Sequence, residues 1–132
     1  MPALDRPVVK PRPVYLNLVR IRLPVPGIVS ILHRVSGALL FLFGIPLLLF
    51  AVERSLGGPE AVAGLQAVLA SPLVKLVLIG FLWAYLHHFC AGIRYLCIDL
   101  HVGDDLAGAR RSSVIVLAVS LALTLIIGVR VW

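Results

Sequence analysis

The sequence predicts an all-α integral membrane protein with three transmembrane helices and an N-terminal arm at the membrane surface. Of the 132 residues, 61% are hydrophobic and 14% are charged, whereas about a quarter of the residues in a soluble domain are charged. Three apolar stretches each provide the ~20 residues that a helix needs to cross a bilayer. Residues 1–132 are therefore expected to form a single membrane domain, with no room for a soluble catalytic domain.

The first elements are an arm over residues 1–25 and a transmembrane helix over residues 27–52. Prolines recur between positions 2 and 26 and prevent a regular helix in the arm. The arm also carries five basic residues, which suit a membrane surface: Arg6, Lys10, Arg12, Arg20 and Arg22. Within the first span, Pro46 is expected to produce a kink.

The next elements are a short interfacial helix and two further spans. Residues 55–72 begin as a turn and continue as a mildly amphipathic helix that is too short to cross the bilayer. The second span covers residues 73–100 and the third covers residues 113–130. The loop between these spans is expected to hold the polar residues His101, Asp104, Asp105, Arg110 and Arg111.

The basic residues predict the orientation of the chain. The arm and the second loop are richer in Lys and Arg than the first loop, which has only Arg54 and Lys75. The positive-inside rule therefore places the N-terminus in the cytoplasm and the C-terminus on the opposite side. The net charge of +6 is explained by this topology and by anionic lipid, so we expect a lipid partner and no nucleic acid.

Three polar side chains near the start of the first span share one helical face. Ser30, His33 and Arg34, with Gly37 beside them, fall at positions i, i+3, i+4 and i+7. Ionisable groups inside a span are costly unless they face protein, water or a ligand. The cluster is therefore expected to be a functional site, with snorkelling of Arg34 to the headgroups as the alternative.

A second polar group lies near the end of the second span, at a similar expected depth. The adjacent His87 and His88 point about 100° apart. Because Ala84 and Gly92 stand four residues to either side of His88, we expect a groove of small side chains there, as a flat macrocycle beside an axial imidazole requires. His87 has the bulky Trp83 in the corresponding place, so His88 is the better ligand candidate.

Structural roles remain alternatives for the two histidines and for Arg94 and Asp99 in the second span. An intramembrane histidine commonly makes an interhelical hydrogen bond instead of binding a metal. Arg94 and Asp99 are equally consistent with an interfacial anchor and ion pair.

Three motifs occur in order along the chain: Arg12-Pro13-Val14-Tyr15-Leu16-Asn17-Leu18, then Ser30-Ile31-Leu32-His33-Arg34-Val35-Ser36-Gly37, then His88-x-x-x-Gly92-Ile93-Arg94 with Asp99. In these motifs and in nearly its whole length, the sequence resembles the cytochrome b subunit of succinate dehydrogenase, the larger of its two membrane anchors. This resemblance implies a single membrane-anchor domain that packs against a second, small anchor subunit with three helices.

The resemblance also implies roles for individual residues. His88 would be an axial ligand to the iron of haem b, and the small anchor subunit would supply the second ligand. Ser30 and Arg34 would line the ubiquinone pocket near the iron-sulfur subunit, while His33 and Arg34 would contact the haem propionates. Tyr95 stands where the family often has histidine, and a phenol there donates a hydrogen bond but carries no positive charge.

The implied function is the transfer of electrons to the quinone pool from succinate oxidation in peripheral subunits. Quinone reduction would occur at this non-flavin subunit, and FAD and the iron-sulfur clusters would belong to its partners, the flavoprotein and iron-sulfur subunits. The implied location is the bacterial cytoplasmic membrane, with the C-terminus in the periplasm. The alternatives are a fumarate reductase anchor and a small transport or channel subunit in which Arg34 and His88 line an ion path.

Overall fold

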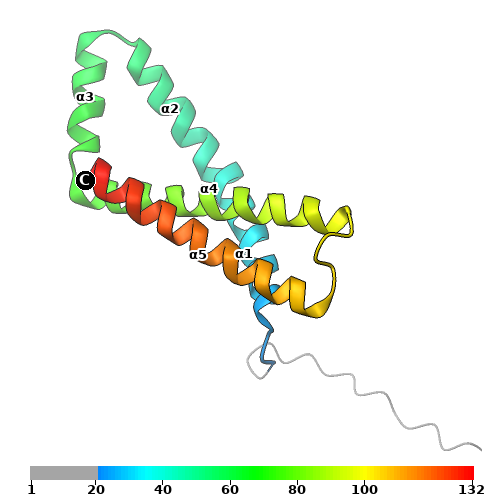
Figure 1. The fold of residues 1–132 in the computed structure, drawn as a ribbon. Helices are drawn as coiled ribbons and strands as arrows, with labels where there is room; N and C mark the ends of the chain where they lie inside the picture. The colour runs from blue at the N-terminus through cyan, green and yellow to red at the C-terminus, as the bar shows by residue number, and fades with distance from the viewer. Residues whose placement is uncertain (1–20) are drawn as a thin grey trace, which may run out of the picture.

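The computed structural model describes residues 21–132 (Figure 1). All regular structure in this part of the chain is helical, and three helical stretches, Val25–Leu56, Pro72–Asp99 and Leu106–Val131, are long and apolar enough to cross a membrane. The predicted class is therefore confirmed. Most of the arm expected over residues 1–25 lies outside the described residues, which begin with a non-helical segment, residues 21–24.

The first span is built from two α-helices joined by a wider turn. Helix α1 covers Val25–Leu39, a π-helical turn (η1) covers Leu40–Gly44, and α2 covers Ile45–Leu56. Pro46 explains the position of this turn, because a proline in a helix has no N–H for the preceding turn and its ring crowds that turn. In the π turn the Ile45 N–H donates to the Leu40 carbonyl, five residues back, so the irregularity precedes the proline.

The remaining elements are α3 (Pro59–Leu69), α4 (Pro72–Asp99) and α5 (Leu106–Val131). Gly58 precedes α3 with a φ of +90°, a conformation that glycine adopts without strain. Helix α5 begins earlier than expected, because the Asp105 side chain accepts a hydrogen bond from the Gly108 N–H at 3.2 Å and caps the helix. The placement of Arg110 and Arg111 in a loop was therefore wrong, since both lie in α5.

The core lies where α1 crosses the pair formed by α4 and α5. Figure 1 shows α4 and α5 running side by side in opposite directions while α1 crosses them. Each of these helices contributes one residue to the buried apolar cluster of Val29, Ala91 and Val116. Helix α2 then diverges from α4, and α3 joins their far ends (Figure 1). The crossing is therefore the region in which the first span is fixed against the other two.

Small residues allow the close contact of α5 with α4. The buried face of α5 consists of Ser113, Val116, Ser120, Thr124 and Gly128. In lipid, such side chains let helix backbones approach each other. Their hydroxyls are satisfied within the helix: Ser113 donates to the Ala109 carbonyl and Thr124 to the Ser120 carbonyl, both at 2.7 Å.

Gly128 provides a test of this packing. A Cβ at this position would lie 3.6 Å from the Ile79 side chain, an ordinary contact, so Gly128→Ala should leave stability nearly unchanged. Gly128→Leu should cost roughly 1–3 kcal/mol by overpacking and lower the thermal unfolding midpoint of the purified protein. Equal midpoints for the two variants would show that α5 does not pack closely at this point.

Candidate functional site

The His88 imidazole packs directly on the backbone of α1. A Cβ on Gly37 would lie only 2.7 Å from His88 Cε1, so a side chain at position 37 would displace the ring. His88 Nδ1 lies 3.0 Å from the His33 carbonyl oxygen. Because a carbonyl only accepts, Nδ1 must carry the proton in this bond, which leaves the lone pair on Nε2.

Ser36 completes the surroundings of His88 Nδ1. Its hydroxyl donates to the same His33 carbonyl at 3.0 Å, and its oxygen lies 3.3 Å from Nδ1. Ser36 is buried at 2% exposure, so both contacts are made away from solvent. This role of Ser36 was not predicted from the sequence. The available signal was the placement of Ser36 three residues after His33, on the same helical face.

His33 and Tyr95 extend the site as a row of rings. The His33 ring stacks on His88 with centroids 4.2 Å apart and planes 12° apart, and it lies 5.1 Å from the Tyr95 ring. His33 also lies against one of the small residues expected to form a groove beside His88, since its Nε2 would be 3.9 Å from a Cβ at Gly92.

Ser30 and Arg34 form a separate pair on the outer side of α1. Arg34 Nη2 donates to Ser30 Oγ at 3.3 Å, and Arg34 is exposed while Ser30 is half-buried. The shared face expected for the motif therefore divides in two. His33 and Gly37 face His88, whereas Ser30 and Arg34 remain open to a molecule that approaches from outside the chain.

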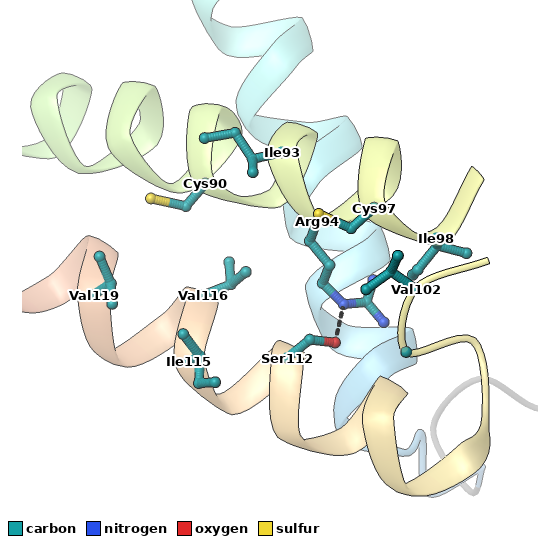
Figure 2. A pocket seen from close by; sticks show the side chains of 11 residues that line it. Cys90, Ile93, Arg94, Cys97, Ile98, Val102, Ser112, Ile115, Val116 and Val119 are labelled. Atoms are coloured by element: carbon teal, nitrogen blue, oxygen red, sulfur yellow. Dashed lines mark hydrogen bonds between the residues drawn. The ribbon is translucent and has the colours of Figure 1, made fainter. Parts of the chain in front are cut away.

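Arg94 links α4 to α5 (Figure 2). It is buried at 7% exposure, and its Nε donates to Ser112 Oγ at 2.9 Å while Nη2 donates to the Ala109 carbonyl at 3.4 Å. Its guanidinium also lies 5.4 Å from the centre of the Tyr95 ring. Among residues 21–132 the expected ion pair with Asp99 is not formed. Arg94 instead joins α4 to α5 through Ser112, and its role as an interfacial anchor stays a prediction.

His87 differs from His88 in having no orienting partner. It is fully buried, it stacks on Trp83 with ring centroids 5.2 Å apart, and neither ring nitrogen has a hydrogen-bond partner within the described residues. The enclosing side chains would have to move before a large ligand could reach this ring. His88 has the stronger geometry for a ligand, because metal-bound histidines usually donate their other N–H to a carbonyl or carboxylate.

The fold and the site together define a class: a three-span helical membrane subunit whose imidazole and phenol groups gather between the first two spans. Residues 9–127 match the succinate dehydrogenase/fumarate reductase transmembrane subunit family, and the chain belongs to this family. The resemblance noted from the motifs is thereby confirmed.

Two relatives are similar over most of the chain. The succinate dehydrogenase cytochrome b556 subunit of Coxiella burnetii (strain RSA 493 / Nine Mile phase I) is 36% identical over 122 residues, which cover 92% of this chain and 97% of that protein. The subunit of the same name from Paracoccus denitrificans is 33% identical over 115 residues, covering 87% of this chain and 88% of its own.

Gly37 provides a test of the contact between α1 and α4. Gly37→Ala should cost roughly 1–3 kcal/mol of stability, because the new methyl group overlaps the His88 ring. The loss should be much smaller in a His88→Ala background, where the overlapping ring is absent, and thermal unfolding of all four combinations measures this coupling. Gly64→Ala is the matched control, since nothing lies within 4 Å of a Cβ there. Additive effects of the two substitutions would contradict the contact.

Proposed function

We propose that this chain binds haem b through His88 and ubiquinone through Ser30 and Arg34, and that it delivers electrons from succinate to the quinone pool. Membership of the family makes the chain a membrane subunit of a succinate dehydrogenase or fumarate reductase. The observation that carries the proposal is the His88 imidazole, which is held through Nδ1 by the His33 carbonyl at 3.0 Å and retains its Nε2 lone pair for a metal.

The residues around His88 fit a haem by their chemistry. A neutral imidazole whose other nitrogen donates to a carbonyl is the usual form of a histidine ligand, because that bond fixes the tautomer and the ring. His33 and Tyr95 lie beside the ligand, and Arg34 follows His33 directly. These three side chains would bind the propionates, with Tyr95 acting as a neutral donor. When bound, the haem supplies a centre that accepts and releases one electron at a time.

Ser30 and Arg34 suit a quinone by their position and their hydrogen-bonding capacity. The hydroxyl of Ser30 accepts from Arg34, so its own proton is available to a quinone carbonyl oxygen. Negative charge develops on that oxygen as electrons arrive, and a fixed guanidinium stabilises it strongly in a low-dielectric site. Ser30 would position the quinone and Arg34 would stabilise its reduced form, with both residues open to the outside of the chain.

The proposal implies partner subunits. One histidine is half of a bis-imidazole site, so the second axial ligand would come from the small hydrophobic anchor subunit. Succinate oxidation would take place in the flavoprotein subunit, and the iron-sulfur subunit would pass the electrons on. The proposed location is a bacterial cytoplasmic membrane, and the basic residues favour the N-terminus inside and the C-terminus in the periplasm.

The names of the two relatives favour succinate oxidation over the reverse reaction, since both are succinate dehydrogenase subunits. Membership of the family disfavours the alternative of a transport or channel subunit.

The haem ligand can be tested by visible spectroscopy. The purified complex should show a b-type band in its reduced-minus-oxidised spectrum, and His88→Ala should abolish it because the iron loses an oriented ligand. His87→Ala should keep the band, since the fully buried His87 ring is not positioned to bind the haem iron. A colourless wild-type complex, or loss of the band in His87→Ala alone, would overturn the assignment.

The quinone site can be tested by comparing two electron acceptors. Ser30→Ala and Arg34→Leu should lower succinate:ubiquinone activity by roughly 100-fold or more, the scale of losing one donor to a developing oxyanion. Reduction of a soluble dye by the peripheral subunits should persist. Arg54→Leu, in α2 at the other end of the same span, is the matched control and should leave both activities intact. Parallel loss of both activities would indicate failed assembly in place of a quinone site.

A further inference from the structure

Arg94 brings a buried positive charge to an apolar groove between α4 and α5. Its side chain makes two hydrogen bonds, to Ser112 and to the Ala109 carbonyl, and both partners are neutral. No carboxylate pairs with it among residues 21–132. An arginine at 7% exposure without a counter-charge is costly in a low-dielectric environment. The groove therefore has a place for an anion.

The rest of this groove suits a hydrocarbon chain. It has a volume of about 390 Å³, and Figure 2 shows Arg94 and Ser112 toward its loop side, with Ile98 and Val102 beside Arg94 and further apolar side chains along the rest of the groove. Those apolar residues include Ile93, Cys97, Ile115 and Val119. The hydrogen bond between Arg94 and Ser112 also holds the guanidinium at the end of the groove nearest the loop between α4 and α5.

A second apolar groove meets the first at Ile115. It has a volume of about 440 Å³ and is lined by Arg110, Arg111, Val114 and Ile115. Arg111 lies four residues before Ile115, so it is one helical turn closer to the start of α5. Both arginines of this second groove are exposed. The two grooves share Ile115 and each has arginine in its lining, which suits a molecule with two hydrocarbon chains and an anionic head.

We propose that an anionic phospholipid binds here, with its phosphate at Arg94 and Arg111 and one acyl chain in each groove. The charge favours this occupant over a zwitterionic lipid, because each arginine near a negative headgroup contributes about 1 kcal/mol of attraction. The two-groove shape favours a diacyl lipid over a single apolar helix. The site lies on the α5 side of α4, away from the proposed quinone residues on α1, and its Arg94 guanidinium lies 5.4 Å from the centre of the Tyr95 ring.

Lipid retention by the intact purified complex tests the proposal. Native mass spectrometry after exchange into an equal mixture of phosphatidylglycerol and phosphatidylcholine should show retained phosphatidylglycerol. Arg111→Gln should weaken this retention about fivefold, the equivalent of one arginine. Ile115→Trp should abolish it by filling both grooves. Because Arg111 and Ile115 are exposed, both variants should fold and keep the haem band.

The matched control is Leu125→Trp, which adds the same bulk at an exposed position of α5 outside both grooves and should retain the lipid. Cys97 provides a second readout, because it is exposed and lines the groove. Phosphatidylglycerol should slow its alkylation by a maleimide, and phosphatidylcholine should not. Equal retention of both lipids, or no effect of Ile115→Trp, would overturn the proposal. So would a Cys97 that stays unreactive in the delipidated complex, because another subunit would then cover the groove.

Discussion

The close approach of α1 to α4 at Gly37 is the contact on which the rest of the site depends. The His88 ring lies where a side chain at position 37 would stand, with a Cβ-to-Cε1 separation of only 2.7 Å. This approach brings the His33 carbonyl and the Ser36 hydroxyl to His88 Nδ1. It also brings the His33 ring to Tyr95, which in turn lies beside Arg94. The missing side chain of one glycine therefore permits a continuous row of polar side chains from α1 through α4 to α5.

Most buried polar side chains in this structure are hydrogen-bonded, since a buried donor without a partner costs free energy. Ser113 and Thr124 bond to their own helix, and Arg94 bonds to α5. His87 is the exception among the described residues, because both of its ring nitrogens are buried and unpaired. Its ring stacks instead on Trp83, with centroids 5.2 Å apart.

Much of the fold could be predicted from the sequence, because three long apolar stretches and their breaks are visible in composition alone. Element ends were less accessible: the Asp105 cap starts α5 ahead of Arg110 and Arg111, which charge had suggested were in a loop. Helical spacing correctly united the polar residues of α1, but it could not show that His33 turns to α4 while Arg34 stays exposed. That division depends on how two helices cross, and spacing within one helix does not contain this information.

The π-helical turn at Leu40–Gly44 changes which residues of the first span share a helical face. A turn of this kind holds one residue more than an α-helical turn. Each residue after the turn is therefore rotated by about 100° around the helix axis. It points in the direction that the preceding residue would take in an unbroken α-helix. Sequence comparisons that pair α2 with an uninterrupted helix will be out of phase unless a one-residue gap is opened here. The turn thus marks a site where the length of the chain can change by one residue while the faces of α1 and α2 are both preserved.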